Sequence, residues 1–135
     1  MSRVYTGATM SIDGYISGPD ESGFDHLFRW YGSGEVEMTT THEDLTFRLT
    51  RQSAEHVRAM VDMTGALVVG RHLFDITSLE AGLLDEIWVD LAPVLLGGGR
   101  PFFDQVAGAP YALDGPVSVV EGDRVTHLRY RVRKG

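Results

Sequence analysis

The stretch that decides the fold is residues 81–104, AGLLDEIWVDLAPVLLGGGRPFFD. We predict a strand over Glu86–Leu96, because alternate residues of this run are apolar and would share one face: Ile87, Val89 and Leu91. Pro93 predicts a bulge or an edge position, since proline has no amide hydrogen to donate to a neighbouring strand. Three glycines, Gly97–Gly99, follow the strand and would let the backbone approach a flat ring or a phosphate; a flexible turn is the alternative.

The clearest elements outside this stretch are strands near both ends of the chain. Arg3–Met10 alternates and is rich in β-forming residues, which predicts a first strand. Val117–Val120 and Val125–Val132 flank the turn sequence EGDR, which predicts an antiparallel hairpin. The arginines of the last strand alternate with apolar residues, which is typical of a half-buried strand with a charged outer face at the edge of a sheet.

The middle of the chain predicts a helix and a further strand. Ser53–Thr64 carries an apolar stripe at helical spacing, formed by Ala54, Val57, Met60, Val61 and Thr64. Ala66–Gly70 is short and continuously apolar, as expected for a strand buried on both faces. One or two helical turns are expected over Arg71–Leu84, so that a β-α-β unit would connect this strand to Glu86–Leu96. These elements predict an α/β fold with a mixed sheet.

Composition indicates a small globular protein. The 135 residues fit a single domain, 1–135, and 43% apolar residues can supply its core. The absence of cysteine excludes disulfides, thiolate metal sites, iron–sulfur clusters and cysteine nucleophiles. A formal net charge of −7 opposes nucleic-acid binding. No apolar run approaches the roughly 20 residues of a membrane span, and the first residues lack a signal-peptide core. We therefore expect a cytoplasmic protein with neither a nucleic-acid nor a membrane partner.

Two further segments could carry chemistry. Gly7 and Ala8 are small residues within the first predicted strand, where a flat ligand could approach the backbone. Asp13 follows, and its carboxylate could bind an amino-substituted heterocycle or relay a proton; alternatively, it only starts a turn with the next glycine. Gly70 and Arg71 lead from a buried strand into a helical turn, where free amides and a guanidinium would suit a nucleotide phosphate. A plain surface junction is an equal alternative there.

The five histidines do not form a recognisable site in the sequence. They lie on different predicted elements, with no His/Asp spacing typical of a metal centre: His26, His42, His56, His72 and His127. Each is interpreted as a surface or packing residue, with His56 on the polar side of its helix. The aromatic stretch Phe24–Tyr31 predicts a short helix or a loop over a pocket, and the polar run Gly32–Glu43 predicts irregular structure.

Three segments in this order are more specific than any one alone: VYTGATMSIDGYISGPD (4–20), TGALVVGRHLFD (64–75) and residues 81–104. They resemble the dihydrofolate-reductase-like family that includes the reductase domain of the riboflavin-biosynthesis deaminase-reductase. The resemblance implies a shortened form of that α/β fold, with a mixed, mostly parallel central sheet, flanking helices and a C-terminal antiparallel hairpin. It also implies NADPH as hydride donor, a pteridine or ribosylaminopyrimidine as small-molecule substrate, and a homodimer.

The resemblance also implies roles for individual residues. Asp13 would lie near the substrate and is the catalytic candidate. The cofactor-binding residues would be Ala8, Gly70, Arg71, Leu96, Gly97 and Gly98. Of these, Ala8 would lie near the nicotinamide, the Gly-Arg pair at the adenosine-phosphate end, and the last three along the nicotinamide pocket. In such an enzyme the cofactor supplies the redox chemistry and the protein orients it, so that no acid–base triad is needed.

One departure from the family pattern falls near Ile76–Ser78. There the segment GRHLFD runs almost directly into residues 78–85, and several dozen family residues have no counterpart, including a Gly-Gly turn that holds the cofactor pyrophosphate. The β-α-β unit would then be a product of this junction. The leading hypothesis is an NADPH-dependent reductase. The alternatives are a non-catalytic form that binds a small molecule, and a mainly structural, dimeric form of the fold without the diphosphate site.

Overall fold

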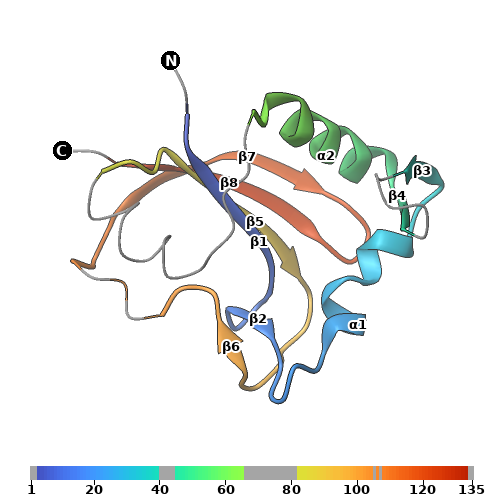
Figure 1. Cartoon of the computed structure of the whole chain (residues 1–135), viewed down its shortest axis with the longest axis horizontal. Coiled ribbons are helices and arrows are strands. Elements are labelled where there is room, and N and C mark those ends of the chain that lie inside the picture. Colours follow the sequence, from blue (N-terminus) through green and yellow to red (C-terminus); the bar gives the residue numbers. More distant parts are fainter. Residues whose placement is uncertain (1–2, 40–44, 66–81, 105, 107, 134–135) are drawn as a thin grey trace.

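The computed structural model describes residues 3–39, 45–65, 82–104, 106 and 108–133. Its elements, in chain order, are β1 (Tyr5–Ser11), β2 (Tyr15–Ser17), α1 (Phe24–Leu27), the 3-10 turn η1 (Arg29–Gly32), β3 (Val36–Thr39), β4 (Thr46–Leu49), α2 (Arg51–Met63), β5 (Glu86–Ala92), β6 (Arg100–Pro101), β7 (Leu113–Glu121) and β8 (Thr126–Val132). Figure 1 shows α2 lying beside the central sheet, with β2, β6 and α1 gathered beyond the ends of β1 and β5.

A four-stranded mixed sheet forms the centre of the molecule, in the order β1-β5-β8-β7. β1 and β5 run parallel, whereas β8 is antiparallel to both β5 and β7. The mixed α/β fold and the C-terminal hairpin are therefore confirmed, but the described sheet has one parallel and two antiparallel pairings and is not mostly parallel. The alternation of arginines had indicated that the last strand lies at an edge of the sheet. That prediction is wrong, because β8 lies between β5 and β7.

The register across the sheet separates an apolar face from a polar face. Met10 and Val89 belong to the main core cluster, which also contains Leu84, Ile87 and Val132. Side chains alternate along each strand, so the intervening positions face the other way. Thr9, Asp90 and His127 are register partners and form one cross-strand row on that second face. The sheet therefore presents polar groups on the side where α2 packs.

The helix α2 begins with a side-chain cap and is rotated relative to the predicted stripe. The Oγ1 of Thr50 accepts a 3.2 Å hydrogen bond from the Ser53 amide, which is the usual N-cap arrangement. Of the predicted stripe, Ala54 is buried and Val57 packs against a core cluster, whereas Val61 is 58% exposed. Ser53 and His56, outside that stripe, are buried as well. His56 is thus not on a solvent-facing side. The rotation follows from the surface beneath the helix, because polar side chains facing inward find hydrogen-bond partners on the polar row of the sheet.

Two other segments differ in part from the sequence predictions. The aromatic stretch folds as α1 and η1, as expected, and Trp30 there enters a second core cluster with Leu49, Ala54 and Val125. Val36–Thr39 pairs antiparallel with β4, so this part of the run predicted to be irregular is a strand. β5 ends at Ala92, immediately before Pro93, so the proline ends the strand instead of bulging it.

Several predictions fall outside the described residues. These are the strand at Ala66–Gly70, with the β-α-β unit built on it, most of the turns at Arg71–Leu84, and the departure from the family pattern at Ile76–Ser78. Among the helices in the described ranges, none has the length and apolar character needed to cross a lipid bilayer.

Candidate functional site

The carboxyl ends of the parallel strands β1 and β5 meet at one end of the sheet, and Asp13 joins the loops that follow them. The Asp13 Oδ2 accepts a 2.8 Å hydrogen bond from the Gly97 amide, and Oδ1 accepts one of 3.2 Å from the Leu96 amide. The Ser11 hydroxyl donates to Oδ1 at 2.5 Å. These bonds lower the pKa of Asp13, with the Ser11 bond contributing most, followed by the Gly97 amide. The ionised Asp13 carboxylate therefore links the loop after β1 to the loop after β5, and we call this set of hydrogen bonds the Asp13 bracket.

The glycine loop held by this bracket has bare backbone on its outer side. Gly97 has φ +77°, and a Cβ added to it would meet nothing within 4 Å. Gly98 would gain only an ordinary contact, 3.7 Å from the Pro19 ring. Gly99 is different, because its Cβ would lie 2.0 Å from the Ser17 carbonyl oxygen, so this glycine is required by packing on β2. Gly97 and Gly98 thus leave open space next to their backbone.

The structure brings Asp13, Leu96, Gly97 and the adjacent Gly98 together, whereas Ala8 lies apart from them. The Leu96 side chain lies against Gly23 at the start of α1. Ala8 pairs with Val89 in the middle of β1 on the apolar face, and no hydrogen bond of the described residues joins it to the glycine loop. Gly7 is small because its register partner is Trp88: an added Cβ would lie 3.2 Å from the Trp88 carbonyl oxygen. Gly70 and Arg71 lie outside the described residues.

A basic hollow adjoins the same end of β5. It is lined by Pro93 and Val94 after the strand, by His26 and Arg29 from α1 and η1, and by Arg124 in the turn between β7 and β8. Two arginines therefore line one surface depression in a chain whose formal net charge is −7. The Asp25 carboxylate lies 3.7 Å from the His26 ring. Such a depression suits an anionic substituent of a ligand.

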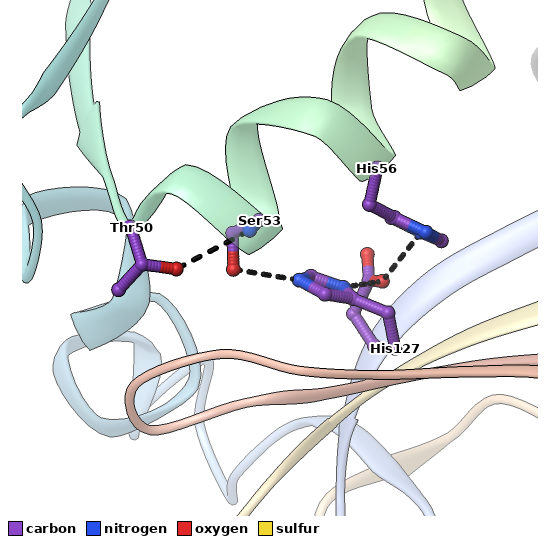
Figure 2. Close-up of polar contacts among 5 residues, drawn as sticks. Thr50, Ser53, His56 and His127 are labelled. Carbon is purple, nitrogen blue, oxygen red and sulfur yellow. Dashed lines mark hydrogen bonds and ion pairs between the residues drawn. The ribbon is translucent and has the colours of Figure 1, made fainter.

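A buried polar cluster lies under α2, and sequence inspection did not find it. The Ser53 hydroxyl is 2.8 Å from His127 Nε2, and His127 Nδ1 is 2.6 Å from the Asp90 carboxylate. His56 Nε2 lies 3.7 Å from the same carboxylate oxygen, and its ring stacks on that of His127 with 4.2 Å between centroids. Figure 2 shows Ser53 and His56 reaching from successive turns of α2 toward His127.

The cluster has the atom order of a Ser-His-Asp triad but lacks access for a substrate. Ser53 is 1% exposed and His127 is fully buried, and Gly122 closes over the hydroxyl, since a Cβ there would lie 2.3 Å from Ser53 Oγ. A nucleophilic serine must reach a carbonyl carbon and needs oxyanion donors beside it. We therefore interpret the contacts from Ser53 to Asp90 as a buried hydrogen-bond network, not as a hydrolytic site.

The protonation of His56 follows from this environment. Burial lowers its pKa to about 4, with a further lowering from His127 and an opposing effect of Asp90. The ring is therefore neutral at pH 7, and its nitrogen lone pair is available as an acceptor or ligand. The sequence held one signal that could have indicated the cluster. Alternation places Asp90 and His127 on the polar faces of their strands, and the two residues lie opposite each other once β5 and β8 pair.

Beside the cluster, Glu86 and Arg129 form a second buried polar group on the same face. The guanidinium donates to both carboxylate oxygens of Glu86 at 2.8 and 3.2 Å and lies 4.2 Å above the centroid of the Trp88 ring. The Trp88 indole also donates to Glu86 at 3.1 Å. Glu86 is 2% exposed, so its charge is balanced inside the protein by Arg129.

Comparison with solved structures shows which known fold the chain shares. The structure is similar to the crystal structure of a protein assigned to riboflavin biosynthesis from Shewanella sp. PV-4, with a TM-score of 0.58 and 17% identity over 99% of this chain and 100% of that one. RibD from Acinetobacter baumannii aligns with a TM-score of 0.48 and 12% identity over 98% of this chain, which spans 58% of that protein. No protein-family model and no curated protein matches the chain. At these identities, what is shared is the fold, and the chain has the dihydrofolate-reductase-like fold expected from its sequence.

Proposed function

We propose that the protein is an NADPH-dependent reductase of a small heterocyclic substrate, of the pteridine or ribosylaminopyrimidine type. The observation that carries the proposal is the bracket by which Asp13 holds the amides of Leu96 and Gly97 beyond the carboxyl ends of two adjacent parallel strands. In open α/β sheets, ligands bind outside this end of the strands. The fold similarity to a protein assigned to riboflavin biosynthesis supports the same choice.

The residues at this end fit the nicotinamide part of the cofactor. Gly97 and Gly98 leave open space where side chains would otherwise project, so a flat ring can lie against their backbone. When bound, the cofactor supplies the hydride. The chain's contribution is to hold the ring and its reactant in register, and the rigid Asp13 bracket serves that positioning. Gly70 and Arg71 remain our assignment for the adenosine-phosphate end.

Asp13 can also contact the substrate, because its carboxylate is exposed at the edge of the bracket. Its lowered pKa keeps it ionised at neutral pH, so it can accept a hydrogen bond from an amino substituent of a heterocycle but does not store a proton to donate. We assign it a binding and positioning role in this reductase. A proton needed by the reduced product would then come from water.

The basic hollow favours a substrate with an anionic group. Arg29 and Arg124 would pair with a phosphate, which a ribosylaminopyrimidine phosphate carries and a simple pteridine lacks. Exchanging Arg29 for Gln should therefore raise the KM of a phosphorylated substrate about tenfold, the effect of roughly 1.4 kcal/mol, while kcat changes little. Arg58→Gln, at an exposed position of α2, is the matched control.

The experiment that tests the proposal measures NADPH binding and turnover by the full 135-residue chain. NADPH is titrated while protein fluorescence and thermal unfolding are followed, and its oxidation is then measured with phosphorylated and unphosphorylated heterocycles. A ligand at about 100 times its Kd should stabilise the protein by roughly 2.7 kcal/mol. We expect saturable binding that Gly98→Ala weakens and Gly32→Ala does not, since neither glycine requires positive φ.

The same experiment separates the proposed reductase from the alternatives. Saturable binding of a heterocycle without NADPH oxidation would indicate a non-catalytic small-molecule-binding protein. Absence of any shift with millimolar NADPH would reject the reductase altogether. Turnover that Gly98→Ala leaves unchanged would place the cofactor elsewhere on the molecule.

A further inference from the structure

The cluster under α2 unites three potential metal ligands from three different elements. His56 comes from α2, Asp90 from β5 and His127 from β8, and their ligand atoms all lie within 4.8 Å of one another. We propose that these three side chains bind a divalent first-row transition-metal ion, such as zinc. Two imidazole nitrogens and one carboxylate oxygen form a donor set that such ions take in proteins, with a remaining position for water or a ligand.

Charge in the cluster favours a cation. Asp90 has no arginine or lysine within ion-pair distance among the described residues; its recorded ion-pair partners are the imidazoles of His56 and His127. Arg129 lies near His56, but Glu86 balances its charge through two hydrogen bonds. The Asp90 carboxylate therefore lies in a largely buried cluster, 22% exposed, without an arginine or lysine partner among the described residues. A bound divalent ion would give this carboxylate a cationic partner, since buried charged groups are generally paired or coordinate metals.

The distances are close to those that coordination requires. Ligand atoms around a tetrahedral zinc ion lie about 3.3 Å apart, given metal–ligand bonds of about 2.0 to 2.2 Å. In the structure His56 Nε2 is 3.7 Å and His127 Nδ1 is 2.6 Å from Asp90 Oδ1. The ion would therefore replace the proton shared by His127 and Asp90 and part those two atoms by less than about 1 Å. Because the two imidazole rings are stacked, with 17° between their planes, the His56 ring would also have to turn so that both nitrogens point at one ion.

Ser53 provides the outer partner that metal-binding histidines need. Its hydroxyl lies 2.8 Å from His127 Nε2, the nitrogen opposite the one that faces Asp90. A hydroxyl can donate or accept, so it can donate to Nε2 when Nδ1 carries the proton and accept from Nε2 when Nδ1 binds the ion. The Thr50 cap fixes the Ser53 backbone, and through it the position of this hydroxyl. The network is thus compatible with both the metal-free and the metal-bound form.

The side of the cluster that remains open is the side of Asp90. Its side chain is 22% exposed, compared with 6% for His56 and zero for His127. Tyr31, which hydrogen-bonds Thr9, lies close enough to Asp90 for that carboxylate to raise the pKa of the phenol, second to the effect of burial. An ion could enter here, and a water or small ligand would occupy its fourth position beside the Tyr31 hydroxyl.

Zinc binding to the untagged, chelator-treated chain tests this proposal without any nicotinamide cofactor, so its result is independent of the reductase. Isothermal titration with zinc chloride should give one site per chain with micromolar or tighter affinity. His56→Gln and Asp90→Asn should each weaken it at least tenfold, and Ser53→Ala should weaken it roughly tenfold through the lost outer partner. The control is His26→Gln, an exposed histidine on α1, which should bind as the wild type does.

A second measurement on the wild-type chain covers the case in which a variant does not fold. Cobalt(II) should give the intense visible absorption of a four-coordinate site and should broaden the ring-proton NMR signals of His56 and His127 ahead of those of His26. Wild-type protein that binds neither zinc nor cobalt at millimolar concentration would overturn the proposal. Binding that survives in folded His56→Gln and Asp90→Asn, or broadening confined to His26, would overturn it as well.

Discussion

At the scale of single residues, Asp13 does the most to shape the proposed site. The glycine loop has few side chains to hold it in place. The Asp13 carboxylate holds it instead, by accepting hydrogen bonds from the backbone amides of Leu96 and Gly97. The sequence predicted its chemical importance but gave it the role of proton relay or substrate ligand. The structure adds an architectural role that no local pattern could show, because the amides it binds lie more than 80 residues away along the chain.

Asp13→Ala removes the bracket and should loosen the loop without disturbing the sheet. We expect NADPH affinity to fall roughly tenfold or more, because the ring would then have to order the loop on binding. Titration of both proteins by fluorescence measures the change. Asp104→Ala, an exposed carboxylate just beyond β6, provides the comparison and should bind like wild type. Unchanged affinity in Asp13→Ala would contradict the positioning role.

Glu86→Gln probes the second buried polar group on the same face. It removes the charge that balances Arg129, and breaking a buried pair from one side typically costs about 3 to 5 kcal/mol. Since Arg129 is 27% exposed, it keeps part of its hydration, and we expect a loss of about 2 kcal/mol in unfolding free energy. Urea denaturation measures it. Asp114→Asn, which breaks the solvent-exposed pair with Arg133, should leave the midpoint nearly unchanged.

At the scale of elements, the sequence predicted which segments are helix and strand better than how they meet. The alternation and turn chemistry of the first strand, the β7–β8 hairpin and the strand at Glu86 are confirmed because each pattern is local. Sheet order is not local. Nothing in the arginine alternation of β8 shows that it returns between two strands, so the edge position inferred from it was wrong.

The orientation of α2 likewise could not be predicted from the sequence of the helix alone. An apolar stripe predicts the buried face only if the surface beneath is apolar. Here the sheet presents Thr9, Asp90 and His127, so Ser53 and His56 face inward and Val61 does not. The histidine cluster was consequently invisible in the sequence, where His56 and His127 lie far apart and each was interpreted by itself.

The packing of α2 on this polar row should make stability depend on pH. The pKa of His56 is about 4 in the folded protein and near 6.5 when unfolded, so the unfolded chain binds more protons between these values. Stability is therefore full above about pH 6.5 and falls as the pH is lowered toward 4, by up to about 3 kcal/mol. The charged or titratable groups facing the ring are Asp90 on β5 and His127 and Arg129 on β8.

Urea midpoints measured in chelator from pH 7.5 to 4 test this dependence. His56→Gln should flatten the profile, whereas His26→Gln, an exposed position, should retain it. A profile unchanged in His56→Gln would show that another group is responsible. A wild-type protein that gains stability as the pH falls through this range would contradict the sign of the effect.

At the scale of the whole molecule, β7 forms one outer strand of the described sheet, and three of its apolar side chains remain exposed: Leu113 at 38%, Val117 at 43% and Val119 at 58%. Among the described strands, β7 pairs only with β8, and an outer strand with exposed apolar residues invites pairing with another chain. This supports the homodimer implied by the sequence resemblance, which stays a prediction. A symmetric pairing of two β7 strands would satisfy both features.

Sedimentation velocity at micromolar concentration should show a dimer for the wild-type chain and a monomer for Val119→Lys, because the lysine would place a charge within the apolar contact. Val61→Lys, an equally exposed valine on α2, should remain dimeric. A wild-type monomer across this concentration range would contradict the prediction.

The central claim is that the glycine loop bracketed by Asp13 receives the nicotinamide ring. The most direct measurement is a titration of nitrogen-15-labelled protein with NADPH, in which the glycine amide signals are followed by NMR. We predict that the amides of Gly97 and Gly98 shift saturably with a common Kd, while that of Gly122, in the β7–β8 turn, does not move. Saturable binding that leaves Gly97 and Gly98 unchanged would contradict the account.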